Sequence, residues 1–174
     1  MPYTTLDIKE PGLNVLPPGV ERHVVNAGGL TGLQIFPDDE IEIINDEGNQ
    51  ICEVICFDKD GKSELSILSL KENSKKSFIK EILKKKDESS LTTNLQLKKR
   101  NLNLNKSHSS ILFDDKTPSG EKIKIKSKDK CYVIFSAPQN NMIVSEQNPS
   151  SDLIVFVKRA KIENDKELSI IPDP

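Results

Sequence analysis

Apolar and polar residues alternate along much of this chain, in short runs that end at Gly, Pro, Asn or Asp. In residues 40–45, Ile41 and Ile43 face one way while Glu40 and Glu42 face the other. Such period-two alternation is typical of β-strands, and the residues that end each run favour turns. On the same grounds we expect strands at 22–26, 32–36, 50–57, 63–69, 94–105, 110–114, 122–126, 131–137 and 152–160.

The turns between these runs predict how some of the strands are connected. Residues 45–49 (NDEGN) and 58–61 (DKDG) are of the kind that joins antiparallel neighbours. The strands at 40–45, 50–57 and 63–69 are therefore expected to form a three-strand meander.

The run at 94–105 alternates with a change of register. Its first two leucines have odd residue numbers and its last two have even ones. Because side chains on one face of a strand recur at every second residue, a strand here needs a bulge or break near residues 99–100.

One segment has helical rather than strand periodicity. Four apolar residues between 78 and 83 recur at helical spacing. Asn73 or Ser74 can cap the N-terminus of this helix, and lysines 84–86 suit its C-terminus. About ten strands with one short amphipathic helix predict an antiparallel all-β fold, either a sandwich or a barrel.

The chain of 174 residues is long enough for one domain with a substantial core. Residues 1–20 are rich in Pro and Gly and are expected to form an extended N-terminal arm. A single β-rich domain then spans 21–171. The last residues, 172–174 (PDP), fit either the start of a linker or a C-terminus.

Composition narrows the range of partners. The formal net charge of −2 gives no general reason to bind nucleic acid. No run of 18 apolar residues suggests a membrane span, and the first residues lack the features of a secretory signal. Three cysteines are an odd number without a disulfide framework. We therefore expect a cytoplasmic protein.

Residues 71–106 are strongly basic, although the whole chain has a small negative net charge. They hold eleven Lys or Arg against four acidic residues, a net +7, with Phe78 as their one aromatic residue. A basic surface with a single aromatic residue offers little on which nucleic-acid bases can stack. This segment is better explained as a solvated helix face, or as a face that docks onto an acidic neighbouring module.

The cysteines do not predict a metal site. Cys52 and Cys56 lie on one face of a strand, where four residues span about 13 Å. That separation is too long for a disulfide or for two ligands of one zinc ion. With Cys131 they are expected to be small core residues, and residues 58–61 lack the carboxylate positions of an EF-hand loop.

Glu53 is the first candidate for function. It shares its strand face with Ile51, Ile55 and Phe57. A carboxylate among apolar neighbours needs a partner or a raised pKa, and such residues are frequent at functional sites. The alternative is an edge strand from which the acid reaches water.

His108 is the second candidate. It stands in NKSHSSILFDD, upstream of Asp114 and Asp115. A histidine with carboxylates nearby can bind a metal or transfer protons. Without a paired-histidine motif, a plain surface or core role is the alternative for His108 and for His23. The Gly-rich residues 26–32 lack a phosphate-binding pattern and predict a loop that lets a ligand approach the backbone closely.

One resemblance extends these observations. The stretches PPGVERHVVNAGG and GLQIFPDDEIEIINDEGNQICEVICF resemble the urea-carboxylase-associated family, which is also found attached to proteins related to the glycine-cleavage T protein. Residues 131–158 are similar to the family's later strand and turn. The turn of Asp46, Gly48, Asn49 and Gln50 looks like the family's turn, and Glu53 stands where an Asp is usual.

The resemblance implies a β-rich domain associated with one-carbon or amine metabolism. Asn49, Gln50, Glu53 and His108 become its candidate ligand-binding residues, with no catalytic residue assigned. The neighbouring C-terminal module would be a folate-dependent aminomethyltransferase, and tetrahydrofolate would bind there rather than to this chain.

Three functions remain open at this point. The first is an accessory β-domain that binds a small molecule or packs on such a catalytic module. The second is a metal-dependent enzyme acting on a small amine or amide, with Glu53, His108 and an Asp. The third is a structural interaction module that docks through its basic helix.

Overall fold

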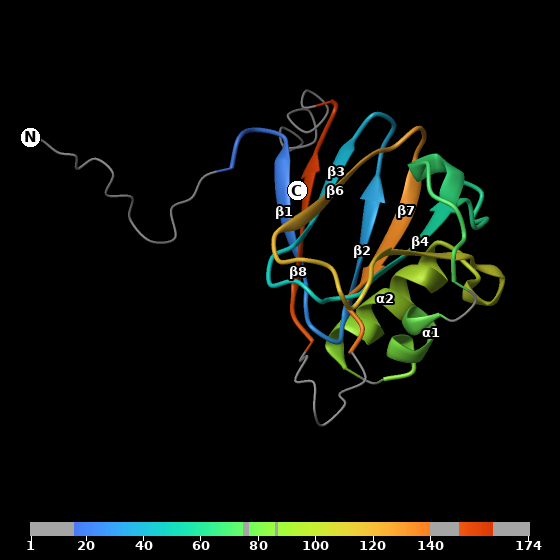
Figure 1. Ribbon diagram of the computed structural model, residues 1–174. Helices are drawn as coiled ribbons and strands as arrows, with labels where there is room; N and C mark the ends of the chain where they lie inside the picture. Colours follow the sequence, from blue (N-terminus) through green and yellow to red (C-terminus); the bar gives the residue numbers. More distant parts are fainter. Residues whose placement is uncertain (1–15, 75–76, 86, 140–149, 162–174) are drawn as a thin grey trace, which may run out of the picture.

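The computed structural model describes residues 16–74, 77–85, 87–139 and 150–161. Their eight strands form two antiparallel four-stranded sheets that pack face to face as a sandwich (Figure 1). The strands are β1 (Val20–Val25), β2 (Leu30–Ile35), β3 (Glu40–Asn45), β4 (Cys52–Asp58), β5 (Ser109–Phe113), β6 (Glu121–Lys126), β7 (Cys131–Ser136) and β8 (Leu153–Lys158). The expected antiparallel β-sandwich is confirmed.

The two sheets differ in what covers them. The first sheet has the order β1-β8-β3-β6 and the second β2-β7-β4-β5. In the first sheet, β3 and β8 alternate between buried and more exposed residues, as expected for one covered face. In the second, β7 is buried throughout and β4 nearly so. Helices α1 (Phe78–Leu83) and α2 (Glu88–Lys99) lie on its outer face (Figure 1).

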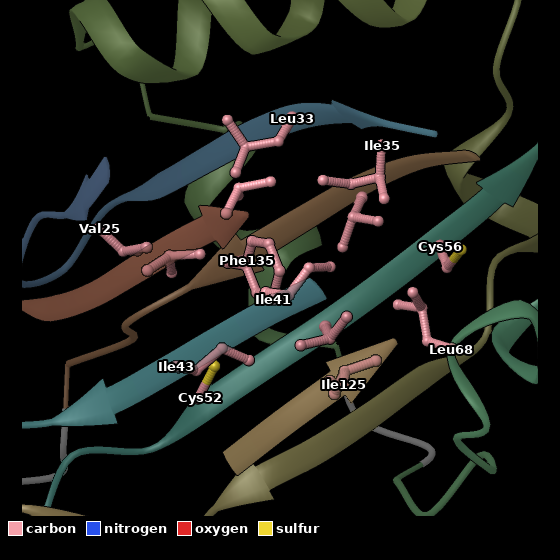
Figure 2. Packing of buried hydrophobic residues seen from close by; sticks show 14 of the residues in the cluster. Val25, Leu33, Ile35, Ile41, Ile43, Cys52, Cys56, Leu68, Ile125 and Phe135 are labelled. Atoms are coloured by element: carbon pink, nitrogen blue, oxygen red, sulfur yellow. The ribbon is translucent and has the colours of Figure 1, made fainter. Parts of the chain in front are cut away.

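Two apolar clusters hold these layers together. Between the sheets, Ile41 and Ile43 of β3 meet Phe135 of β7 and the cysteines of β4 (Figure 2). Between the second sheet and the helices, Ile55 and Phe57 pack with Ile79 of α1. Burial of apolar area is the main stabilising contribution in both layers.

The first helix begins later than expected. Ser77 is its N-cap, and its Oγ accepts a hydrogen bond from the backbone N–H of Lys80. Asn73, one of the two expected caps, instead exchanges hydrogen bonds with the backbone of Ile111 in β5. The other, Ser74, forms an isolated β-bridge with Ser109. The two expected caps were wrong because these residues extend the sheet before the helix starts.

The strand expected at 94–105 was wrong, and so was the single helix. Residues 88–99 form α2, capped by Asp87, whose Oδ1 accepts from the N–H of Ser90 at 2.9 Å. The change of register marks the end of this helix, where Asn101 has φ of 55°. The apolar alternation was misleading because Leu95 is exposed while Leu97 is buried.

The three-strand meander was also wrong. Strands β3 and β4 belong to different sheets, and residues 65–68 form a 3₁₀ helix, η2 (Leu65–Leu68). The turn at 45–49 therefore crosses from one sheet to the other. Gly48, with φ of 80°, packs so tightly there that a Cβ would lie 2.6 Å from the backbone nitrogen of Ser119. The turn at 58–61 is confirmed, since Asp58 Oδ1 accepts from the N–H of Asp60 and of Lys62.

Two parts of the expected organisation lie outside the described residues. These are most of the arm at 1–20 and the tail at 172–174. Within the described part of the chain, no helix has the length and apolar character needed to cross a membrane.

Arg159 joins the two sheets at one edge of the sandwich. Its guanidinium donates hydrogen bonds to Glu21 of β1, to the carbonyl of Gln34 in β2 and to Asp39 at 2.8 Å. The Asp39 side chain is 2% exposed. The hydrogen bond from Arg159 lowers the pKa of Glu21, so this edge is fixed by charge as well as by packing.

Replacing Arg159 should therefore weaken the sandwich. We expect Arg159→Ala to lower the free energy of unfolding by about 3 kcal/mol, because Asp39 stays buried without its cation. Lys124→Ala removes an ion pair with Glu42 in which the lysine is 81% exposed, and should cost less than about 1 kcal/mol. Urea denaturation measures both losses. Equal, small losses would contradict a structural role for Arg159.

Candidate functional site

Glu53 is buried and is held by the start of α1. Its side chain has 0% exposure in the middle of the second sheet, where β4 lies between β7 and β5. Oε2 accepts from the backbone N–H of Phe78 at 2.6 Å and of Ile79 at 3.0 Å, and Oε1 accepts from Ser77 Oγ at 3.0 Å. Ser109 of β5 adds a further hydrogen bond. The edge-strand alternative was wrong.

Burial and hydrogen bonding shift the pKa of Glu53 in opposite directions. Burial raises the pKa of the carboxyl, while the hydrogen bonds from Ser109, Ser77 and the two helix N–H groups lower it, and burial prevails. The N-terminus of a helix presents unpaired N–H groups that suit a carboxylate. Glu53 thus does chemically what a capping residue does, although it comes from a strand 24 residues upstream of Ser77.

Gln50 is also buried, and all of its amide is used. Its Nε2 donates to the carbonyls of Ile51 and Pro138, and its Oε1 accepts from the N–H of Ser151 at 2.8 Å. Its own carbonyl accepts from Asn45 Nδ2. Gln50 therefore ties together the ends of β3, β4 and β7 and the start of β8.

The neighbouring Asn49 has φ of 58°, and its N–H donates to the carbonyl of Thr117 at 2.7 Å. The backbone of Asn49 thus holds the crossing between the sheets beside the connection from β5 to β6. Asn49 and Gln50 lie together at this crossing, as the turn motif suggested. Their role as ligand-binding residues stays a prediction.

His108 lies apart from these residues on the surface. Its ring is 56% exposed, and Nδ1 is 2.8 Å from Glu72 Oε2. The hydrogen bonds of Glu53 come from Ser77, Ser109, Phe78 and Ile79, so the described structure does not join Glu53 to His108. The remaining histidine, His23, pairs with Glu21 at 3.0 Å.

All three cysteines are buried and free, as the core interpretation predicted. Cys52 and Cys56 belong to the cluster between the sheets. Cys56 is hydrogen-bonded to Cys131 of the adjacent β7, a pairing that sequence spacing could not indicate. That bond and burial raise the pKa of Cys56, and burial raises the pKa of Cys52. Among the described residues, no three His, Cys, Asp or Glu side chains are placed to hold a metal ion.

A groove runs between the Gly-rich loop and α2. It has a volume of about 600 Å³, and its lining includes Gly28, Gly29, Gly32, Asp87 and Tyr132. The sequence pointed to the loop but not to the groove. Its other wall is α2, which the alternation had assigned to a strand.

The pH dependence of stability tests the buried carboxyl. A raised pKa means that the folded protein keeps a proton that the unfolded chain has already lost. The stabilisation that Glu53 contributes is therefore present below the ordinary pKa of a glutamate. It is lost as pH rises through the pKa of Glu53 in the folded protein. The comparison is with Glu53→Gln, which cannot ionise and keeps one acceptor oxygen for the N–H groups of α1. Relative to this variant, the parent protein should lose stability as pH rises from the ordinary pKa of a glutamate through the raised pKa of folded Glu53. Urea denaturation at a series of pH values measures the difference.

Two further variants serve as comparisons in this experiment. Glu53→Ala should cost about 2–3 kcal/mol at pH values below the ordinary pKa of a glutamate, because the N–H groups of α1 lose their acceptor. Its cost relative to the parent protein should shrink as pH rises, because the alanine variant lacks the titrating group. Glu40→Gln, at an exposed position of β3, is the control for loss of a carboxyl that the fold does not bury. Parallel pH profiles for the parent protein and Glu53→Gln would show that the pKa of Glu53 is not raised by folding.

The burial of the three cysteines leads to a second prediction. In the native protein a thiol reagent such as DTNB should react slowly with all three, since only an exposed thiolate attacks readily. Three equivalents should react at once in denaturant. Ser66→Cys, at an exposed position of η2, should add one fast equivalent in the native state. Rapid native reaction of the parent protein would contradict the burial.

Comparison with known proteins shows what this chain is similar to. No family model matches the chain, and the resemblance to the urea-carboxylase-associated family is not confirmed. Over 167 residues the chain is 31% identical to a trimethylamine-oxide aldolase of Ruegeria pomeroyi. This match covers 96% of the chain but 21% of the relative. The chain is thus similar, along almost all of its length, to about a fifth of a larger enzyme named for an amine oxide.

Proposed function

We propose that this chain is an accessory β-domain of amine metabolism, which packs on a catalytic module and binds a small molecule there. The observation that carries the proposal is the extent of the match. Almost the whole chain is similar to a segment that makes up 21% of a trimethylamine-oxide aldolase. A segment of this size is that of one domain, so most of the relative's length is left for other parts of that enzyme.

The outer side of α2 supports packing on a partner. Leu91 and Leu95 lie one helical turn apart and are 54% and 59% exposed. Lys98 and Lys99 follow in the last turn of the helix. An apolar pair with basic neighbours suits a protein surface that is apolar at its centre and acidic at its rim. This agrees with the docking expected for the basic segment 71–106.

The contacts of Glu53 favour an accessory role over the metal-dependent enzyme. Both of its carboxylate oxygens are engaged, by Ser77 and by the N–H groups of α1. Such bonds account for the buried acid through folding alone. In its finer form, the proposal keeps the expected partner: a folate-dependent aminomethyltransferase-type module on the C-terminal side, with tetrahydrofolate bound to that module.

A chimaera tests the accessory role. In the Ruegeria pomeroyi relative, the segment that matches this chain is replaced by the chain itself, and loss of trimethylamine N-oxide is followed by proton NMR. We expect the chimaera to be active and the isolated chain to consume none of the compound. Consumption by the isolated chain would overturn the proposal.

The docking surface is tested in the same chimaera. Leu91→Glu with Leu95→Glu should lower activity at least about tenfold if the pair is buried against a module, since burying two unpaired charges costs several kcal/mol. The matched control is Glu40→Gln with Glu42→Gln on the first sheet, which should keep activity within about twofold. Circular dichroism of the isolated variants shows whether each domain still folds. Unchanged activity of the leucine variant would exclude α2 as the docking face.

A further inference from the structure

We propose that a pocket at the C-terminal end of α2 binds the phosphate group of a small molecule, either free phosphate or a phosphate monoester. The pocket lies where the ends of β2, β4 and α2 meet the start of β7, and it has a volume of about 220 Å³. This inference rests on the proposed function, whose small-molecule ligand it locates and assigns to a chemical class. Two features carry it: the excess of basic side chains in the lining, and an arginine that is held in place by uncharged groups.

The lining of this pocket is basic. Lys59, Arg100 and Lys130 come from three separate segments of the chain, and Asp58 is the one acidic residue of the lining within the described structure. The formal charge of the lining is therefore +2. Like charges gathered in a hollow attract ions of the opposite sign. A doubly charged anion matches this excess.

Arg100 is positioned without a counter-ion. One of its N–H groups donates to Gln34 Oε1, and its guanidinium lies 4.7 Å from the centroid of the Tyr132 ring. Gln34 is itself fixed, because its Nε2 donates to the carbonyls of Ile35 and Cys131. The other N–H groups of the guanidinium have no acceptor in the described part of the chain. An oriented guanidinium with unused donors suits the oxygens of a phosphate.

Arg159 shows the contrast with a structural arginine in the same fold. Its guanidinium is paired with the carboxylates of Glu21 and Asp39, so the fold itself balances its charge. Among the described residues, no carboxylate forms an ion pair with any of the three cations of the pocket. Arg100 therefore keeps its positive charge for a ligand.

Two features of the pocket oppose an anion, but the cations outweigh them. Asp58 contributes one negative charge, although its Oδ1 already accepts from the N–H groups of Asp60 and Lys62. The C-terminal end of α2 contributes about half a negative charge, and three of its last carbonyls accept from the backbone N–H groups of residues 100–102. The three basic side chains carry twice the sum of these opposing charges.

The size of the pocket favours one small group. Its volume of about 220 Å³ is below the roughly 300–1,000 Å³ of sites that enclose a whole drug-sized ligand. A phosphate monoester carries a charge of about −1.5 to −2 at pH 7 and three strong acceptor oxygens, whereas a carboxylate carries a single charge. The pocket therefore suits a phosphate group, with the rest of a monoester outside it.

Titration of the ¹⁵N-labelled full chain tests the site. The probes are inorganic phosphate, glycerol 3-phosphate and sodium chloride at matched ionic strength. We expect both phosphates to shift the amide signals of Lys59, Arg100 and Lys130 saturably, and chloride to leave them in place. Either order of affinity supports the site, and the tighter of the two probes identifies the source of the phosphate group. Absence of saturable shifts, or equal shifts with chloride, would overturn the proposal.

Substitutions identify the contacts. Arg100→Gln should weaken phosphate binding at least about tenfold, because a charge-assisted hydrogen bond is lost. Asp58→Asn keeps the Oδ1 acceptor of the turn and should strengthen binding about threefold, because one repelling charge is removed. The matched control is Lys122→Gln, an exposed position on β6 in the other sheet, which should keep the affinity within about twofold because distant charges are screened. Equal affinity of the parent protein and Arg100→Gln, or weaker binding after Asp58→Asn, would overturn the assignment.

This test is separate from that of the accessory role. The titration uses the isolated chain and measures binding alone, whereas the chimaera measures turnover. Binding with an inactive chimaera would support the site and count against the proposed function. An active chimaera without binding would do the reverse.

Discussion

The attachment of α1 to Glu53 is the contact on which the helical side of this protein depends. A strand carboxylate reaches the first N–H groups of a helix, so the helix start is fixed on the second sheet at one point. Ile79 and Ile82 then cover the outer face of that sheet. The hydroxyl of Ser90 in α2 donates to the carbonyl of Ile82 at 2.9 Å, which sets the second helix against the first. The groove exists because α2 is held there.

A second set of polar contacts, made by Gln50, joins the two sheets. The crossing from β3 to β4 leaves backbone groups that no ladder satisfies, and an unpaired buried group is costly. With one amide, Gln50 satisfies the carbonyl of Ile51 in this crossing, the carbonyl of Pro138 after β7 and the N–H of Ser151 before β8. A shorter side chain cannot reach both Pro138 and Ser151. Glu53 and Gln50 therefore add polar contacts to the apolar packing that already joins these strands and helices.

The positions of the strands could be predicted from the sequence more accurately than the pairing between strands. The reason is physical. Alternation is a local property, so all eight strands begin and end close to the expected residues. Pairing depends on where a turn leads, and NDEGN gives no local sign that it crosses between sheets. Helix α2 was missed because Leu91 and Leu95 face outward, which hides the apolar stripe. With α2 read as a strand, the groove and the position of Tyr132 in it could not be foreseen.

A further contrast separates polar groups that the fold satisfies from those that it leaves unpaired. Glu53 attracted attention because it is charged and buried, yet every oxygen it presents is already bonded within the fold. Buried polar groups are nearly always paired, so the informative residue is the one whose pairing is incomplete. By that criterion the informative side chains among the described residues are Asn45, Ser136 and Ser151, each of which has a buried oxygen without a hydrogen-bond partner.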